Sequence, residues 1–266
     1  MNDQPPIISL LTDFGLEDEY VGVMKGVIFT GCPQARIVDI CHSIPAQNIA
    51  RAASMLTTSY TYFPPGTVHL TVVDPGVGTA RHILVVEADG HLFIAPDNGV
   101  LTPLLRSPSL SACHRLKMPS AEKSSATFHG RDIMAPAAAQ LAAGAAPATL
   151  GDEVAPADCL EIEAAAAVVT PDGVTGEVSA IDHFGNIATT ISTEHIAAMG
   201  AKVLVIIGDT TLERIHRTYG EVAEKAPLAL IDSRGFLEIA VNRGDAAAIL
   251  DCQVGDRVRL LHRSKR

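Results

Sequence analysis

Apolar and polar positions change their spacing along the first half of the chain, so that strand-like and helix-like segments follow one another. Short apolar runs typical of buried strands occur at residues 7–11, 35–40 and 67–73. Segments with helical spacing occur at residues 19–29, 48–60, 99–105 and 130–143. Residues 82–86 and 92–95 flank Asp89 and Gly90, a pair typical of tight turns, and predict a β-hairpin. This alternation predicts an α/β domain with a largely parallel sheet.

The spacing changes again in the second half. Residues 143–167 are rich in Ala and Pro and carry few large apolar side chains, which is typical of a connection between domains. Beyond them, strand-like runs separated by Gly, Asp and Asn occur at residues 174–181, 187–191, 202–207, 228–231, 236–241 and 257–261. We therefore predict an α/β N-terminal domain over residues 1–160 and a smaller, mostly β C-terminal domain over residues 161–266.

Composition narrows the function. Of the 266 residues, 47% are hydrophobic and 19% charged, which is enough apolar material for a folded core. The net charge of −10 is the opposite of what binding to a phosphate backbone favours, so no nucleic-acid partner is expected. The apolar runs are far shorter than the ~20 residues that cross a bilayer, and the N-terminus lacks the basic region of a signal peptide. We therefore expect a cytoplasmic protein without membrane contact.

The motifs do not predict a bound cofactor or metal. The five cysteines are odd in number and form no CxxC, which favours small buried side chains over a disulfide framework or a zinc site. Residues 76–78 (GVG) match neither GxGxxG nor GxxxxGK[ST], so we do not expect the chain to use a nicotinamide cofactor or ATP.

Polar residues gather where the predicted strands of the first half end, and open α/β sheets bind ligands at such ends. Asp13 and Asp18 follow the first strand. Asp74 follows the third strand, Arg81 comes seven residues later, and His129 precedes the last helix. Structural alternatives stay open, because aspartates often cap helices or form turns and a histidine ahead of a helix is often structural.

A second polar group lies in the C-terminal half. Residues 182–186 (DHFGN) combine a carboxylate, an aromatic ring and an amide. A purine would suit such a group, because the ring offers a flat apolar face and the amide can read the edge of the base. Ser233 and Arg234 begin a similar segment. The alternative is an ordinary β-turn, with Gly185 in a left-handed conformation and Phe184 in the core.

Blocks spread over residues 11–247 match one family in order. They read LTDFGLEDEYVGVMKGVI, IVDICHSIP, FPPGTVHLTVVDPGVGTAR, FIAPDNGVL, TFHGRDIMAPAAA, IDHFGNIATTI and SRGFLEIAVNRGDAA. On these blocks the sequence resembles the S-adenosylmethionine hydroxide adenosyltransferase family, the relatives of fluorinase and chlorinase. The resemblance implies two domains, a homotrimer, and active sites between the N-terminal domain of one subunit and the C-terminal domain of its neighbour. It also implies attack of water or hydroxide on the ribose C5′ of S-adenosylmethionine, which releases adenosine and L-methionine.

The resemblance further implies roles for individual residues. The group that activates water is matched by Asp74, Arg81 and His129. Contacts to the ribose and to the wall around the reacting centre are matched by Asp13, Thr127 and Phe128. Contacts to the methionine part are matched by Asp18, Asp182, Ser233 and Arg234. Contacts to adenine are matched by Phe184 and Asn186, and the residues that close the pocket by Glu238, Val241 and Arg243.

Differences from the halogenating relatives favour water as the nucleophile. In those relatives the positions of Asp74 and His129 are tyrosines, and that of Gly130 is a serine that helps to bind halide. The sulfonium leaves as a neutral thioether, so the difficulty lies in the weak nucleophile. His129 is expected to take the proton of water as a general base, because an ordinary histidine pKa is ~6.5, and Arg81 to hold the developing hydroxide. No cofactor or metal is needed, because the substrate carries its own activating charge.

Three other functions stay open. A non-catalytic sensor would bind S-adenosylmethionine or adenosine and release no adenosine. A metal-dependent hydrolase would use His42, Asp74, His129 and Asp132, although no HExxH-like spacing supports it. A halogenase would depend on halide. The neighbouring Arg131 and Asp132 are interpreted as a charge pair in the first helical turn.

Overall fold

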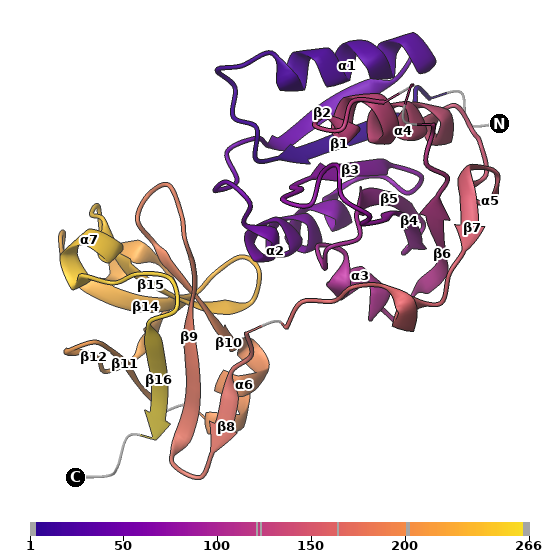
Figure 1. Ribbon diagram of the computed structural model, residues 1–266. Coiled ribbons are helices and arrows are strands. Elements are labelled where there is room, and N and C mark those ends of the chain that lie inside the picture. The colour runs from indigo at the N-terminus through magenta and orange to yellow at the C-terminus, as the bar shows by residue number, and fades with distance from the viewer. Residues whose placement is uncertain (1–3, 121, 123, 164, 201–202, 263–266) are drawn as a thin grey trace. The chain divides into compact units, whose positions relative to one another are not determined.

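The computed structural model describes residues 4–120, 122, 124–163, 165–200 and 203–262. The chain divides into two compact units, Met1–Ile162 (unit 1) and Glu163–Arg266 (unit 2), which are described separately (Figure 1). None of the described helices is both long enough and apolar enough to cross a bilayer.

Unit 1 is built on a mixed sheet of order β2-β1-β3-β5-β4-β6-β7. Its strands are β1 (Ile7–Thr12), β2 (Arg36–Cys41), β3 (Val68–Val72), β4 (Ile83–Ala88), β5 (His91–Pro96), β6 (Leu110–Leu116) and β7 (Gly151–Glu153). The pairs β1–β2, β1–β3 and β3–β5 are parallel, whereas β4–β5, β4–β6 and β6–β7 are antiparallel. The expectation of a largely parallel sheet is therefore wrong. The β4–β5 hairpin reverses the chain beside β3, and β6 and β7 continue the antiparallel part.

Helices cover both faces of this sheet. They are α1 (Tyr20–Gly31), α2 (Ile49–Ser59), α3 (Thr102–Leu105), α4 (Ala135–Ala142) and α5 (Pro147–Leu150). Figure 1 shows α1 and α4 on one face of the sheet and α2 and α3 on the other. Apolar side chains of α1 and α4 share one core with the sheet, and those of α2 and α3 share a second core with it. Each large apolar side chain buried in these cores contributes about 1.5–3 kcal/mol to folding. Helix α1 leaves Tyr20, Val23 and Phe29 41%, 37% and 45% exposed.

Local sequence explains several of these elements. Asn48 caps α2, because its side chain accepts a hydrogen bond from the N–H of Arg51 at 2.9 Å. Asp89 and Gly90 both have positive φ angles, 52° and 75°, as the tight turn of the predicted hairpin requires. The α1 helix ends at Gly31, and Pro33 cannot continue it.

The segment predicted as a connection, residues 143–167, holds ordered elements in its first part. It contains α5 and the short strand β7, which pairs with β6 at the sheet edge. The sequence analysis predicted neither β6 nor β7, for two reasons. Strand β6 (LSACHRL) has no clean alternation of buried and exposed residues, and β7 is only three residues long. Residue 164 lies outside the described residues.

Unit 2 is mostly β, in a sheet of order β12-β11-β16-β9-β10-β15-β14-β13 with β8 paired to β9. Its strands are β8 (Val168–Thr170), β9 (Gly173–Ile181), β10 (Ile187–Ser192), β11 (Val203–Ile207), β12 (Thr210–Leu212), β13 (Ile215–His216), β14 (Pro227–Ile231), β15 (Phe236–Val241) and β16 (Arg257–His262). Its helices are α6 (Thr193–Met199) and α7 (Ala246–Leu250). Residue 202, the first of the predicted strand 202–207, lies outside the described residues.

Candidate active site

The carboxyl ends of β1 and β3 meet at one edge of the unit 1 sheet, because the two strands are parallel neighbours. Thr12 and Val72 are paired in this ladder, and Asp13 and Asp74 follow within two residues of that pair. Two carboxylates predicted from separate motifs therefore emerge from adjacent strands, at the edge where open α/β sheets bind ligands.

Asp74, Arg81 and His129 form one hydrogen-bonded chain. Arg81 donates from Nε to Asp74 Oδ1 at 2.9 Å and from Nη2 to Asp74 Oδ2, a bidentate ion pair. Its Nη2 also donates to His129 Nδ1 at 3.0 Å. The side chains of Arg81 and Asp74 are each 7% exposed, and His129 is 6% exposed. The fold thus brings together three residues that the sequence analysis selected from two distant segments.

One nitrogen of Arg81 has no protein partner in the part of the chain that the structure describes. Arg81 Nη1 is buried and makes no hydrogen bond to a described residue. A guanidinium offers five N–H donors, and a buried donor without a partner is costly. Nη1 is therefore a donor suited to a small anion or a water molecule.

His129 is a neutral hydrogen-bond donor in this arrangement. A guanidinium has no acceptor, so His129 Nδ1 must accept the Arg81 N–H, and the proton of the neutral ring lies on Nε2. Burial and the charge of Arg81 lower the pKa of His129, and the carboxylates of Asp74 and Asp132 oppose this shift. The ring is therefore neutral at pH 7 and presents Nε2–H.

A wide helical turn follows His129. Gly130–Met134 forms a π-helical turn that leads into α4, and such turns often occur at functional sites. Within it, Arg131 and Asp132 form an ion pair with an N–O distance of 2.6 Å, which confirms the predicted charge pair. Asp132 also accepts a hydrogen bond from the N–H of Ser125 at 2.7 Å.

The loop after β2 fixes the loop that carries Asp13. The N–H of Gln47 donates to Asp13 Oδ2 at 2.8 Å, and the N–H of Gly15 donates to the carbonyl of His42 at 2.7 Å. The His42 ring adds a hydrogen bond between Nδ1 and Thr12 Oγ1 at 2.8 Å. These contacts set the direction of the Asp13 carboxylate. The predicted Asp18 is exposed, in the bend before α1.

The four residues considered for a metal-dependent hydrolase contact other side chains rather than one shared point. His42 contacts Thr12 and lies 3.1 Å from Asp39, Asp132 pairs with Arg131, and Asp74 and His129 both bond to Arg81. Over the described ranges, no group of three or more His, Cys, Asp or Glu side chains is placed to share one ion.

An aromatic cluster includes Phe128, the residue before His129. Phe128 makes edge contacts with Phe14 and Tyr20, with ring centroids 5.8 and 5.3 Å apart, and Phe14 and Tyr20 are 5.6 Å apart. The neighbouring Thr127 is exposed, and its hydroxyl lies 3.1 Å from that of Ser125. The sequence analysis selected Phe128 and Thr127 but missed Phe14 and Tyr20. Their positions next to Asp13 and Asp18 in DFGLEDEY were the available signal.

In unit 2, Asp182, Phe184 and Asn186 share one tight turn between β9 and β10. Asp182 Oδ1 accepts the N–H groups of Phe184 and Asn186 at 2.8 and 2.9 Å, and Oδ2 accepts from Asn186 Nδ2 at 3.0 Å. Gly185 is left-handed, at φ 81°, and a Cβ there would lie 2.1 Å from Asp245 Oδ1. The predicted turn is present, yet Phe184 is 73% exposed rather than in the core.

The β14–β15 turn carries Ser233 and Arg234. Both residues are exposed. Arg234 is held by Asp232, because its Nε donates to Asp232 Oδ2 at 2.7 Å and its N–H donates to Oδ1 at 2.8 Å. This ion pair fixes the guanidinium, so any anion that Arg234 binds must use its remaining N–H groups.

The last predicted residues lie in different surroundings. Glu238 is 6% exposed and accepts a hydrogen bond from the Tyr219 hydroxyl at 2.8 Å, and its pKa is raised, chiefly by burial. Val241 is buried in the core of unit 2. Arg243 is exposed and pairs with Glu224. The sequence analysis missed Tyr219, because YG in a polar loop carries no distinctive pattern.

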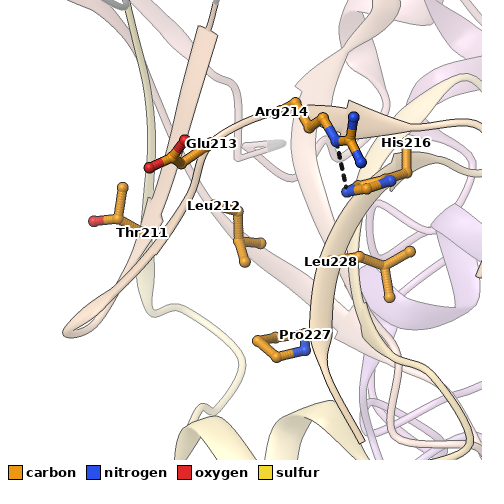
Figure 2. A pocket seen from close by; sticks show the side chains of 7 residues that line it. All are labelled: Thr211, Leu212, Glu213, Arg214, His216, Pro227 and Leu228. Carbon is orange, nitrogen blue, oxygen red and sulfur yellow. Dashed lines mark hydrogen bonds between the residues drawn. The ribbon is translucent and has the colours of Figure 1, made fainter. Parts of the chain in front are cut away.

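A pocket of unit 2 contains none of the predicted residues. Its lining residues are Thr211, Leu212, Glu213, Arg214, His216, Pro227 and Leu228 (Figure 2). Figure 2 shows Arg214 Nε donating to His216 Nε2, at 3.3 Å. This pocket gives no support to the candidate site.

Comparisons with known proteins agree on one family. Residues 8–151 match the model of the SAM hydroxide adenosyltransferase N-terminal domain, and residues 176–259 match that of the C-terminal domain. An (R)-S-adenosyl-L-methionine hydrolase from Thermus thermophilus is 41% identical over 264 residues, covering 96% of this chain and 99% of that protein. A fluorinase from Actinopolyspora mzabensis is 27% identical over 291 residues, covering 96% of this chain and 97% of that protein.

Solved structures resemble the whole chain. An uncharacterized conserved protein from Thermotoga maritima has a TM-score of 0.88 at 36% identity, covering 96% of this chain and 100% of that one. A conserved hypothetical protein from Thermus thermophilus has a TM-score of 0.78 at 38% identity, with the same coverage. The two matched domain models and the identity to full-length relatives show that this chain belongs to the SAM hydroxide adenosyltransferase family.

Proposed function

We propose that this enzyme hydrolyses S-adenosylmethionine to adenosine and L-methionine by attack of an oxygen nucleophile on the ribose C5′. The observation that carries the proposal is the buried, hydrogen-bonded group of Asp74, Arg81 and His129, in which Arg81 Nη1 is a donor without a partner among the described residues. Relatives 31–41% identical over nearly the whole chain carry the name (R)-S-adenosyl-L-methionine hydrolase, and we extend the proposal to the (R) epimer at sulfur.

We propose that the reaction requires no metal or cofactor, because the substrate is already activated. The sulfonium carries a full positive charge, which displacement at C5′ removes, and the leaving thioether is neutral and needs no proton. The enzyme must therefore supply a competent nucleophile in line with the C5′–S bond. Holding the two partners in that geometry supplies up to about 7–11 kcal/mol of the barrier reduction.

The donors of the site suit hydroxide. Arg81 Nη1 and His129 Nε2–H are both donors, and a charge-assisted bond to an oxyanion is roughly twice as strong as a neutral one. Asp74 orients the guanidinium and balances its charge. A general-base role for His129 would need a lone pair on the ring, but Nδ1 accepts from Arg81 and Nε2 carries the proton. We therefore assign His129 the role of a donor to hydroxide rather than that of a base.

The remaining predicted residues are proposed to bind the substrate. Asp13 binds the ribose hydroxyls, and Thr127 and Phe128 form the wall around C5′. The ring face of Phe184, 73% exposed, stacks on adenine, and Asn186 contacts the edge of the base. Asp18, Asp182, Ser233 and Arg234 hold the methionine part, and Glu238, Val241 and Arg243 close the pocket.

Gly130 supports water over halide. A Cβ at this position would lie 3.2 Å from Val72 Cγ1 and 3.4 Å from Met24 Sδ, so a serine would crowd the core beneath His129. The site also has a carboxylate and an imidazole where the halogenating relatives are expected to carry tyrosines.

We also propose that the protein works as a cytoplasmic homotrimer, with each active site completed by unit 2 of a neighbouring subunit. Support comes from the exposed apolar side chains of Leu16, Tyr20 and Val23 in unit 1, 72%, 41% and 37% exposed, which a partner surface would cover. The exposed Phe184 in unit 2 is available to a ligand shared between subunits.

The deciding experiment is incubation with each sulfonium epimer in ¹⁸O-water, followed by mass analysis of the adenosine. We expect ¹⁸O in the 5′-hydroxyl, faster turnover of the (R) epimer, and no loss of activity with a chelator or without halide. Tight binding without release of adenosine would instead identify a sensor. Activity lost on chelation would identify a metal-dependent hydrolase, and a 5′-halogenated product would identify a halogenase.

A further inference from the structure

Residues 96–99 (PDNG), at the end of β5, lie at the same sheet edge as the candidate nucleophile site. Strands β3 and β5 are parallel neighbours, with Leu70 paired to Ile94, so their carboxyl ends meet at one edge. Asp74 follows β3, and Asp97 and Asn98 follow β5. None of the roles proposed above uses this segment.

The Asn98 side chain forms a hydrogen bond to the residue before Asp74. Its Nδ2 donates to the carbonyl of Val73 at 2.9 Å, and its Oδ1 accepts from the N–H of Val100 at 3.2 Å. Val73 is fully buried and lies beyond the last residue of β3, so Asn98 supplies the bond that a neighbouring strand would otherwise make. An amide is suited to this place because it donates and accepts at once.

The residue beside Asn98 holds the other end of the same segment. The N–H of Asp97 donates to the carbonyl of His82, the residue after Arg81, at 2.9 Å. Residues 73 and 82 are therefore both bonded to the Asp97–Asn98 pair, and residues 74–81 form the loop between them. Within this loop the N–H of Val77 donates to the carbonyl of Asp74 and the N–H of Thr79 to that of Gly76, both at 3.2 Å, so these turns are local.

We propose that Asn98 is a positioning residue for the nucleophile site. Through its hydrogen bond to the Val73 carbonyl, Asn98 fixes the start of loop 74–81. It thereby positions Asp74 and Arg81, and through Arg81 also His129. This inference rests on the proposed function. It predicts that Asn98 acts on the chemical step and not on the binding of nucleoside. The reason is that Asn98 contacts Val73, the residue before the loop, and not the residues proposed to bind the substrate.

The test compares Asn98→Asp, Asn98→Ala and the matched control Thr67→Val. Asn98→Asp keeps an acceptor for Val100 but cannot donate to Val73, and Asn98→Ala removes both bonds. Thr67 is 1% exposed and donates from Oγ1 to the carbonyl of Pro64 at 2.7 Å, so its valine variant loses a similar buried bond away from the site. The readouts are kcat for adenosine release, the Kd of adenosine, thermal unfolding, and NMR titration of the His129 ring.

For both Asn98 variants we expect kcat to fall about 10- to 100-fold, because an error of 1 Å in position costs about that much, with the Kd of adenosine changed less than about twofold. The titration of His129 should move toward the ordinary histidine range as its contact with Arg81 loosens. Thr67→Val should lower thermal stability and leave kcat and the His129 titration unchanged.

The inference is overturned if folded Asn98 variants keep the wild-type His129 titration, or if Thr67→Val loses as much kcat as they do. The titration does not depend on the reaction, so it judges the inference even if the wild-type protein releases no adenosine. That last result would reject the proposed function and would leave the positioning of loop 74–81 to be judged by the His129 signal.

Discussion

Arg81 is the residue on which the candidate site depends. Its side chain is 7% exposed, and a guanidinium stays charged when buried. Asp74 compensates this charge, and removing one partner of a buried ion pair costs about 3–5 kcal/mol because it leaves the other charge unpaired. The same guanidinium selects the tautomer of His129. One residue therefore determines both the charge balance and the hydrogen-bond polarity of the site.

The polarity of His129 leads to a prediction for the pH dependence. Because the pKa of His129 is lowered from its ordinary value of ~6.5 by burial and by the charge of Arg81, the ring is already mostly neutral at pH 6.5. If His129 donates to hydroxide, kcat/KM should keep rising above pH 7, by up to about tenfold per pH unit, as hydroxide becomes more abundant. The measurement is initial adenosine release from pH 5.5 to 9.5, corrected for uncatalysed breakdown. A plateau above pH 7, with no further rise, would instead identify His129 as the base.

At the scale of elements, a polar chain crosses the unit 1 sheet. Ser9 of β1 lies 2.6 Å from His69 Nδ1 of β3, and His69 Nε2 lies 3.3 Å from His91 Nδ1 of β5. His69 is fully buried and stacks on Phe93 with ring centroids 5.0 Å apart. Burial, with a smaller contribution from His91, lowers the pKa of His69 to about 3. These strands are therefore joined by a neutral imidazole that folding keeps unprotonated.

The buried His69 should make the stability of the protein sensitive to acid. An unfolded histidine takes up a proton near pH ~6.5, whereas folded His69 does so only near pH 3. The stability contributed by neutral His69 is complete above pH ~6.5 and is lost as the pH falls toward about 3, by up to about 1.4 kcal/mol per pH unit. Urea unfolding between pH 7 and 4 should show a weaker pH dependence for His69→Gln, which does not titrate. The exposed control His262→Gln should keep the wild-type dependence, and equal slopes in all three proteins would reject this role.

At the scale of the whole molecule, the predicted ligand residues are divided between two units. Asp74, Arg81 and His129 belong to unit 1, whereas Phe184, Asn186 and Arg234 belong to unit 2. Each group is ordered by contacts within its own unit: the guanidinium pair and a π-helical turn in unit 1, and two aspartate-centred turns in unit 2. The proposed function needs both groups, and the homotrimer proposal combines them from different subunits.

Complementation between inactive variants tests this arrangement. Asp74→Asn damages the unit 1 group, and Phe184→Ala damages the unit 2 group. If sites are shared between subunits of a cyclic trimer, co-expression of the two should leave about one quarter of the sites intact, and activity should recover to about that fraction of wild type. Co-expression of Asp74→Asn with His129→Ala, both in unit 1, should restore nothing. Mixed Asp74→Asn and Phe184→Ala trimers with no recovered activity would mean that sites are not shared.

The sequence predicted those features that neighbouring residues decide, and it failed for features that depend on distant residues. The β4–β5 hairpin followed from Asp89 and Gly90, and the cap of α2 from Asn48, because neighbouring atoms decide both features. Strand β6 was missed because its pairing with β4 and β7, not its own alternation, makes it a strand. Phe14, Tyr20 and Tyr219 were missed because each gains its contact from a residue distant in sequence or outside any motif.

The sequence by itself determined the family, the two-part organisation and the segments that carry chemistry, because motifs and hydrophobic periodicity are properties of the chain order. Only the tertiary structure decided that the unit 1 sheet is mixed, that Arg81 joins Asp74 to His129, and that Arg81 Nη1 is left as a buried donor. It also decided that Asp97 and Asn98 hold both ends of loop 74–81. These features depend on strand order and on hydrogen bonds between distant segments, which only the folded chain brings within reach of one another.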